Sequence, residues 1–355
     1  IGVFDEYTDS SKPELGIVDD SKYFLGVFDG NNKKIDNIHV FFIDEQSVGG
    51  TGLFACISTG AAIKNLGIGE NSIIEGGDGT GSLVGNMKGG IIENCYNEGL
   101  VTGIGGSFGT GGLIGVGEYG KITNCYNTGM VKGVSDVGGI VGYVDKNFTI
   151  DNCYNCGMIN ASGLFVGGLV GLMYAGTITN SYNIGIISDG PLFVKDIIGA
   201  TDMDPFVIKN CYYSKELTNI GEEITNGISE KSVEEMKAAS FITLLNGGQN
   251  PIAWTADTRN INGGFPILVW QSSPVTGIQN ASEKTDCNIY VVDKSIVVEC
   301  SENVPCQMNV INLNGKIINS QTFLKNNSLN ITDSGIYIVT VNINSQQYTS
   351  KVVIK

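Results

Sequence analysis

The stretch that decides the fold is residues 111–131, Gly-Gly-Leu-Ile-Gly-Val-Gly-Glu-Tyr-Gly-Lys-Ile-Thr-Asn-Cys-Tyr-Asn-Thr-Gly-Met-Val. It holds three short apolar segments, Gly-Gly-Leu-Ile-Gly, Ile-Thr-Asn-Cys-Tyr-Asn and Gly-Met-Val, which are separated by glycine and polar residues. Segments this short and this rich in β-branched residues are typical of strands. Glycine would in addition weaken a helix by about 1 kcal/mol per residue. The stretch therefore predicts three short strands.

The tripeptide Ile-x-Asn of this stretch recurs along the first two thirds of the chain. Successive copies lie 28 to 30 residues apart. Their asparagines are Asn37, Asn65, Asn94, Asn124, Asn152, Asn180 and Asn210. A unit of this length with three strands fits one coil of a parallel β-solenoid, whereas a β-propeller blade needs about four strands in 40–45 residues. We therefore predict an all-β fold with a right-handed parallel β-helix of about seven coils.

Stacked coils place equivalent residues about 4.8 Å apart, so identical side chains form ladders. If a corner at Asn94 resets the alternation after Ile92, Cys95 faces inward and Tyr96 faces outward. The inward cysteines behave as small buried hydrophobes and are Cys95, Cys125, Cys153 and Cys211, with Ser181 in the fifth copy. The outward tyrosines are the candidate ligand-binding residues: Tyr96, Tyr126, Tyr154, Tyr182 and Tyr212.

A row of phenol rings suits sugar or protein contacts, but it also fits self-stacking that stabilises the solenoid. A second outward row is apolar and consists of Leu100, Met130, Met158 and Ile186. An exposed apolar row marks an interface or a surface that another segment covers. Both rows are therefore candidate contact surfaces.

After the last coil the pattern changes to that of a helix. Ser232 and Glu235 form a capping box, and Asn246-Gly247-Gly248 is a stop signal. Residues 262–270 follow as a turn and a strand. We expect these segments to form a terminal cap over the open strand edges of the last coil.

The last part of the chain forms a second domain. Residues 272–284 read as a linker, and short alternating strands follow it. Asn314-Gly315 predicts a two-residue hairpin turn. The predicted organisation is a β-helix with its cap at 1–271, a linker at 272–284, and a small immunoglobulin-like β-sandwich at 285–355.

Composition excludes several classes of function. With 21 basic and 36 acidic residues the net charge is −15, which argues against a nucleic-acid partner. No apolar run is long enough to span a membrane. The chain has one His and one Arg, and no His-Glu-x-x-His zinc motif. We expect no cofactor, no metal and no catalytic residue.

Two cysteine pairs need separate treatment. Cys153-x-x-Cys156 has the spacing of a redox or zinc half-site, but Cys156 takes a variable position of the repeat, so we expect no metal there. Cys300 and Cys306 flank a turn of the last domain, and an exported chain would allow a disulfide between them. The sequence leaves their redox state open.

Two family resemblances rest on these motifs. The Gly-Gly-Leu-Val-Gly and Ile-x-Asn-Cys-Tyr-Asn unit resembles the GLUG repeat of bacterial surface proteins over about residues 20–271. Residues 329–331, 335–337 and 351–355 resemble the C-terminal sorting domain of the type IX secretion system. The second resemblance implies a protein of the Bacteroidetes that is secreted or held at the outer cell surface, with the last domain as its sorting or anchoring module.

The function we expect is that of a non-enzymatic, adhesin-like protein. Its rigid solenoid would present one face to a glycan or to a host or cell-surface protein. The alternatives are a pure carbohydrate-binding module and a glycan-active β-helix enzyme, a lyase or a hydrolase. The enzyme would need a groove lined by carboxylates. The identity of the partner and the oligomeric state stay open.

Overall fold

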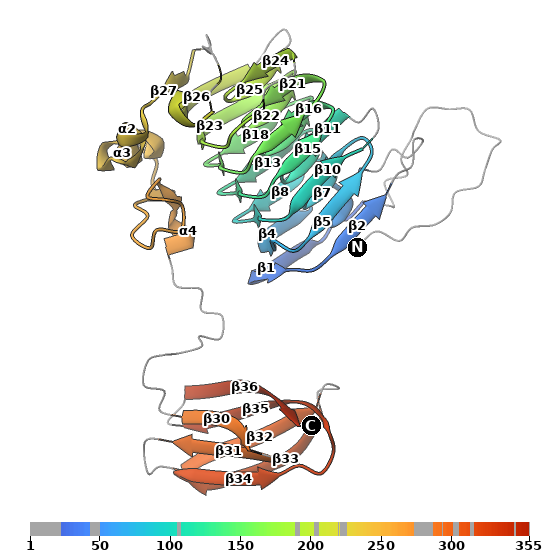
Figure 1. Ribbon diagram of the computed structural model, residues 1–355, viewed down its shortest axis with the longest axis vertical. Helices are drawn as coiled ribbons and strands as arrows, with labels where there is room; N and C mark the ends of the chain where they lie inside the picture. Colours follow the sequence, from blue (N-terminus) through green and yellow to red (C-terminus); the bar gives the residue numbers. More distant parts are fainter. Residues whose placement is uncertain are drawn as a thin grey trace, which may run out of the picture. The chain divides into compact units, whose positions relative to one another are not determined.

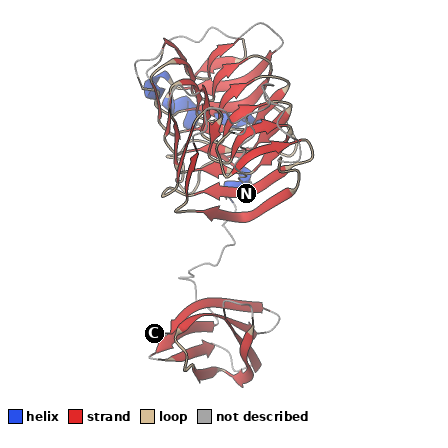
Figure 2. Ribbon diagram, turned by 90° about the vertical axis from the view of Figure 1, so that its right-hand side faces the viewer, coloured by secondary structure: helices blue, strands red, loops and turns tan. Residues whose placement is uncertain are grey.

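The computed structural model describes residues 23–42, 50–104, 108–188, 192–201, 206–218, 220, 226–272, 287–292, 294–300, 305–312, 316–343 and 346–354. The chain forms two compact units, Ile1–Val275 and Thr276–Lys355. The first unit is a parallel β-solenoid, which confirms the predicted fold class, and it has about six turns in place of the predicted seven (Figures 1 and 2).

Four parallel sheets run along the described part of the solenoid, and the central coils contribute to all four. Sheet 1 contains β3 (Phe54–Ser58), β7 (Val84–Lys88), β12 (Ile114–Gly117), β17 (Val141–Val144), β22 (Val170–Met173) and β25 (Ile198–Thr201). Sheet 2 contains β1 (Val27–Ile35), β4 (Ala62–Ile68), β8 (Gly90–Glu93), β9 (Tyr96–Asn97), β13 (Gly120–Thr123), β14 (Tyr126–Asn127), β18 (Phe148–Asp151), β19 (Tyr154–Asn155), β23 (Gly176–Asn183), β26 (Phe206–Tyr213) and β27 (Ile228–Glu230).

The other two sheets have five strands each. Sheet 3 contains β2 (His39–Phe42), β5 (Ile73–Gly76), β10 (Leu100–Gly103), β15 (Val131–Gly133) and β20 (Ile159–Ala161). Sheet 4 contains β6 (Thr80–Gly81), β11 (Phe108–Gly111), β16 (Ser135–Gly138), β21 (Leu164–Gly167) and β24 (Leu192–Lys195). The sequence predicted three strands per coil and missed the strands of sheet 4. Phe-Gly-Thr-Gly (108–111) of β11 contains no apolar run, whereas β21 and β24 begin with Leu-Phe-Val, so the strands of sheet 4 share no sequence pattern.

Asparagine makes the corner inside sheet 2. All seven asparagines of the Ile-x-Asn tripeptide have a left-handed backbone, with φ between 51° and 57°. Asparagine tolerates this conformation better than other side chains do. The corner resets the alternation of side chains, so that Ile92 and Cys95 both point into the core while Tyr96 points outward. The predicted parity of this segment is confirmed.

A second asparagine ladder lies inside the solenoid and holds neighbouring coils together. The side chains of Asn97, Asn127 and Asn155 each donate to the Oδ1 atom of the next member of the ladder, at 2.8–2.9 Å. Each also donates to a glycine carbonyl two residues later, as Asn127 does to Gly129 at 2.9 Å. A side chain at the neighbouring glycine, Gly139, would collide with Asn155. The repeated Gly-Gly pair therefore leaves room for this ladder.

The solenoid core is a continuous column of Ile, Leu, Val and Cys side chains. Ile92, Ile122, Ile150 and Ile178 stack in register through sheet 2, and Val84, Ile114, Val141 and Val170 do so through sheet 1. Removal of these apolar side chains from water is the main contribution to the stability of the folded solenoid.

Residues 232–272 form a segment that we call the strap. It contains α2 (Val233–Lys237), α3 (Ala239–Asn246), β28 (Trp254–Thr255), β29 (Ile267–Leu268) and α4 (Val269–Ser272), and it follows α1 (Lys215–Thr218) and β27. The capping box is present, with Ser232 Oγ accepting from Glu235 N at 3.1 Å, and Gly247 ends α3 with φ 54°. The predicted helix is confirmed, although it breaks at Ala238 into α2 and α3.

The strap does not sit where the sequence predicted a cap. It runs back along the outside of sheet 2, from the last coil towards earlier ones, beside the stacked strands (Figure 1). A short strand, β27, instead pairs with the open edge of β26. The expectation of a purely terminal cap is therefore wrong, because the apolar side of the strap packs on aromatic rings that project from sheet 2.

The second unit consists of two antiparallel sheets that face one another across a shared core. One sheet has the order β30 (Cys287–Val292), β31 (Ser295–Cys300), β34 (Asn326–Asn330). The other has the order β33 (Ile317–Leu324), β32 (Pro305–Asn312), β35 (Gly335–Ile343), β36 (Gln346–Ile354). The hairpin pairing of β32 with β33 is present, while its predicted turn, Asn314-Gly315, lies outside the described residues. An immunoglobulin-like topology stays a prediction.

Candidate functional site

The five tyrosines predicted to bind ligand form one ladder on the outer side of sheet 2. The rings of Tyr96, Tyr126, Tyr154 and Tyr182 stack with centroids 5.0–5.1 Å apart and interplanar angles of 4–9°. Tyr212 continues the register beside Tyr182, and its ring meets Phe241 of the strap edge-on at 5.0 Å. The sequence therefore placed the ladder on the correct side of the strand.

The strap covers this ladder. Trp254 packs on the rings of Tyr154 and Tyr182 at 5.9 and 5.3 Å. The Tyr182 hydroxyl donates to the Pro266 carbonyl at 2.6 Å, and Gln271 donates to the Tyr154 hydroxyl at 2.9 Å. Tyr154 is 1% exposed and Tyr182 is 0% exposed. The expectation of an open tyrosine face is wrong, because these rings form the interface between solenoid and strap.

The strap also covers the N-terminal end of the ladder. Trp270 stacks on Tyr96 and Tyr126 at 6.2 and 5.8 Å and donates its indole N–H to the Asn124 carbonyl at 2.9 Å. The ladder stops at Gly67, because a side chain there would collide with the Tyr96 ring. Tyr96 and Tyr126 keep part of their surface exposed. The stacked rings fit the alternative of self-stacking, and the strap adds contacts that the sequence did not predict.

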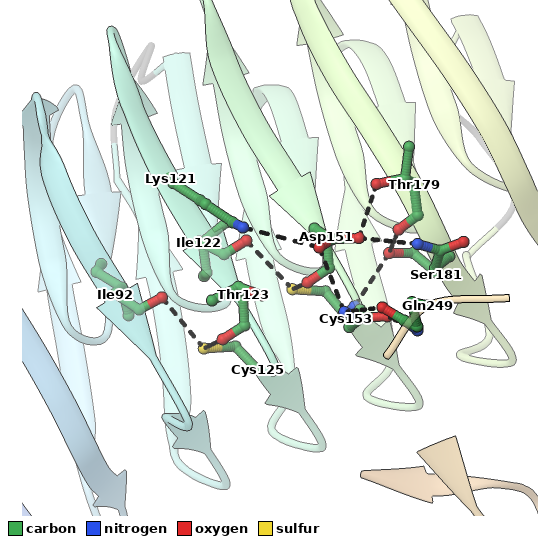
Figure 3. A network of polar contacts seen from close by, with 12 residues as sticks. Ile92, Lys121, Ile122, Thr123, Cys125, Asp151, Cys153, Thr179, Ser181 and Gln249 are labelled. Atoms are coloured by element: carbon green, nitrogen blue, oxygen red, sulfur yellow. Dashed lines mark hydrogen bonds and ion pairs between the residues drawn. The ribbon is translucent and has the colours of Figure 1, made fainter. Parts of the chain in front are cut away.

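The cysteine ladder is buried and chemically inert. Cys125 and Cys153 are fully buried, and each thiol donates to a backbone carbonyl two residues earlier, at 3.1 and 3.4 Å (Figure 3). Ser181 takes the same position and donates to the Thr179 carbonyl at 2.7 Å. Burial raises the pKa of Cys153 to about 12, which removes its thiolate at neutral pH. These cysteines are structural.

The Cys153-x-x-Cys156 spacing brings no pair together. Cys153 belongs to the solenoid core, whereas Cys156 packs among the aromatic residues beneath the strap. Burial raises the pKa of Cys156 to about 12 as well. Among the described residues no group of three His, Cys, Asp or Glu side chains has the arrangement of a metal site. No described helix is long and apolar enough to cross a membrane.

The second predicted row lies on sheet 3 with the expected orientation. Val101, Val131 and Ile159 are fully buried in the register of the sheet, and their neighbours point outward. Met158 and Ile186 are exposed, while Leu100 and Met130 are half-buried. This row is narrow and contains no aromatic ring.

A further group of partly exposed rings was not predicted from the sequence. It follows sheet 1 and its border with sheet 4, and we call it the aromatic face: Phe108, Tyr143, Phe165, Tyr174 and Phe193. Phe193 is 61% exposed, Phe108 44% and Tyr174 37%. Tyr143 lies 6.3 Å from the Phe108 ring and 5.6 Å from the Tyr174 ring, and Phe165 stacks on Phe193 at 5.4 Å.

The two phenylalanines of this face have an unusual backbone. Phe165 and Phe193 both have φ 58°, at the column of sheet 4 that also contains Gly109 and Asp136. The left-handed conformation costs a residue with a side chain about 1–2 kcal/mol. Burial does not offset this cost at Phe193, whose ring is mostly exposed. Strain of this kind gathers at functional sites.

Carboxyl groups border the same face. Asp136 occupies the strained column between Gly109 and Phe165, and it is almost buried. Burial, together with the charge of Asp78, raises the pKa of Asp136 to about 6. Burial and the nearby carboxylate of Asp145 raise the pKa of Tyr143 to about 12, so its hydroxyl remains protonated. The face thus offers ring surfaces beside groups that can accept or donate hydrogen bonds.

The sequence missed the aromatic face because its members are spread over several positions of the repeat, and only Phe165 and Phe193 share one position. Tyr143 aligns with Val116 and Leu172, and Phe108 aligns with Ser135. The signal that could have revealed this face is the presence of aromatic residues at outward positions where other coils have small or aliphatic residues.

Fold and surface together define a β-solenoid protein with one strained, exposed aromatic face, joined to a small sandwich-like unit. Residues 106–132 match the GLUG motif, a match that spans one coil, and residues 291–355 match the Secretion system C-terminal sorting domain. Both resemblances noted in the sequence are confirmed. The sorting domain indicates type IX secretion to the cell surface or the exterior. No curated protein and no solved structure matches the chain.

Proposed function

We propose that this secreted protein is a non-enzymatic, adhesin-like binder whose aromatic face contacts a glycan or a protein outside the cell. The observation that carries the proposal is the strained, stacked pair Phe165–Phe193, in which Phe193 is exposed and Phe165 is half-buried, beside Phe108, Tyr143 and Tyr174. Aromatic rings supply large contact areas with little loss of side-chain entropy, and they dominate many recognition surfaces. The tyrosine ladder and the cysteine ladder serve the scaffold.

The test is binding of the full chain to an array of glycans and extracellular matrix proteins. The variant Phe108→Ala/Phe193→Ala removes two exposed rings from the face, and Met158→Ala/Ile186→Ala removes a similar apolar area from sheet 3 as the matched control. We expect the aromatic variant to lose at least tenfold in affinity for whatever the wild type retains, and the control to bind normally. Equal binding by all three proteins would contradict the proposal.

One observation favours the alternative of a glycan-active enzyme. Asp136 has a raised pKa and lies on the aromatic face, as a general acid for glycoside cleavage would. The same glycans are therefore incubated with the protein and analysed for shorter products. Product formation that disappears in Asp136→Asn would replace the binding proposal by the enzyme, whereas retention without product supports the binder.

A further inference from the structure

The sorting unit is small and carries a cysteine pair at the junction of its two sheets. It extends from Thr276 to Lys355 and has seven strands, and its core contains side chains such as Val298, Met308 and Val339. Units of this size bury a limited apolar area, and small domains outside the cell commonly add a covalent cross-link. The unit functions on a chain that leaves the cytoplasm.

The position of the pair suits such a cross-link. Cys300 is the last residue of β31, and Cys306 is the second residue of β32, so the two belong to opposite sheets (Figure 1). Both side chains lie in the core of the unit. The Cys306 thiol donates to Cys300 Sγ with the two sulfur atoms 3.5 Å apart. A disulfide would shorten this separation to about 2.05 Å.

A competing pairing exists and must be distinguished. Cys287 of β30 lies opposite Cys300 in the register of the antiparallel sheet. A bond between these two would join neighbouring strands of one sheet that are already held together by backbone hydrogen bonds. The Cys300–Cys306 bond would join the two sheets, and the two sulfur atoms of this pair lie 3.5 Å apart.

We propose that Cys300 and Cys306 form a disulfide when the chain leaves the reducing cytoplasm. A thiolate of the pair attacks a disulfide of an exported thiol–disulfide oxidant and forms a mixed disulfide, with release of one thiol of the oxidant. The second thiolate attacks the mixed disulfide and releases the other thiol. The protein loses two protons and two electrons, and one disulfide of the oxidant is reduced to two thiols.

The bond makes unfolding of the sorting unit less favourable. For a closed loop of about seven residues, chain entropy predicts a decrease of about fifty-fold in the unfolding equilibrium constant. The bond ties β31 to β32. Amide hydrogen exchange in these strands should slow by a similar factor where it proceeds through unfolding of the unit.

The experiment uses the full chain, refolded from urea in reduced and oxidised glutathione so that burial does not limit access to the thiols. Non-reducing peptide mapping by mass spectrometry should find one cross-link, between Cys300 and Cys306. Hydrogen exchange in β31 and β32 should then be about fifty-fold slower than in the fully reduced chain. A Cys287–Cys300 cross-link, or complete alkylation of both thiols after oxidation, would overturn the proposal.

Cysteine variants distinguish the effect of the disulfide from the effect of side-chain packing. Cys306→Ala should lose the redox dependence of exchange in β31 and β32, and Cys287→Ala should retain it. If Cys306→Ala does not fold, the peptide map of the wild-type chain still decides between the two pairings. Cys156→Ala, in the solenoid unit, should change neither measurement.

Discussion

At the scale of single residues, asparagine performs two separate tasks in this solenoid. Asn94 and its equivalents adopt the left-handed corner of sheet 2, while Asn97 and its equivalents bind neighbouring coils from inside. The two tasks differ because the two sets of asparagines have different surroundings, although the residue type is the same. The corner needs tolerance of positive φ, and the internal ladder needs a side chain that donates and accepts at once.

The internal ladder predicts a large effect of one substitution. Asn127→Ala removes the acceptor of Asn97 and the donor to Asn155 and to the Gly129 carbonyl, all of them buried. We expect a loss of about 3 kcal/mol in unfolding free energy, because buried partners remain unsatisfied. Urea denaturation followed by tyrosine fluorescence measures it. Asn160→Ala on the exposed side of sheet 3 is the control, and an equal loss in both variants would refute the role of the ladder.

A buried carboxyl predicts the pH dependence of stability. Asp196 is fully buried, and burial raises its pKa from 3.8 to about 6. The folded state favours the protonated form, so this stabilisation is complete below about pH 4 and is lost as the pH rises through 6.

Asp196→Asn should therefore be more stable than the wild type at pH 8, by about 1 kcal/mol after allowance for partial solvation, and not at pH 4. Thermal unfolding at both pH values measures the difference. Glu70→Gln, at an exposed position, is the control and should show no such change. A stability difference for Asp196→Asn that is the same at both pH values would contradict the assignment.

At the scale of elements, the strap binds both the corner asparagines and the tyrosine ladder of sheet 2. Trp254 donates its indole N–H to the Asn180 carbonyl and to Asn152 Oδ1, both at 3.1 Å, while its ring packs on the tyrosines. Gln249 and Asn152 exchange two further hydrogen bonds. The strap therefore recognises corner asparagines of successive coils through their polar groups and the tyrosines through their rings.

Trp254→Ala should release the strap without unfolding the solenoid. We expect a loss of about 3–4 kcal/mol in the free energy of strap docking, since a fully buried indole and its hydrogen bonds disappear. Limited proteolysis should then cut within 232–272 while the coils stay resistant. Ile252→Ala, an exposed position in the same segment, should resemble the wild type. Resistance of the strap in Trp254→Ala would show that it is held elsewhere.

Elements differ in how far they could be predicted. The coils were predictable because each residue contacts its own equivalent one repeat away, so that spacing alone reveals the pairing of Ile92 with Ile122. The contact of Gln271 with Tyr154 spans 117 residues and has no periodic signal. Because no sequence pattern indicated the contact between strap and ladder, the tyrosines were expected to be exposed. In β6 and β11 of sheet 4, glycine and threonine take the place of apolar residues, whereas β21 and β24 begin with Leu-Phe-Val, so sheet 4 has no apolar pattern common to all coils.

At the scale of the whole molecule, the two units have separate roles. The sorting domain at 291–355 indicates export, and in the proposed function the solenoid supplies the binding surface. Deletion of residues 276–355 should abolish export, so that an immunoblot finds the shortened chain in the cells and not on their surface or in the medium. The same deletion should leave the solenoid folded, as measured by circular dichroism of the purified protein. Efficient export of the shortened chain would contradict the role of the sorting domain.

The central claim is that the aromatic face, and not the tyrosine ladder, is the ring surface open to a partner. Hydroxyl-radical footprinting of the full chain, read by mass spectrometry, tests it directly. We expect rapid oxidation at Phe193, Phe108 and Tyr174 and protection at Tyr154, Tyr182 and Trp254. Rapid oxidation of Tyr154 and Tyr182, with protection of Phe193, would contradict the account. The tyrosine ladder would then again be the candidate contact surface.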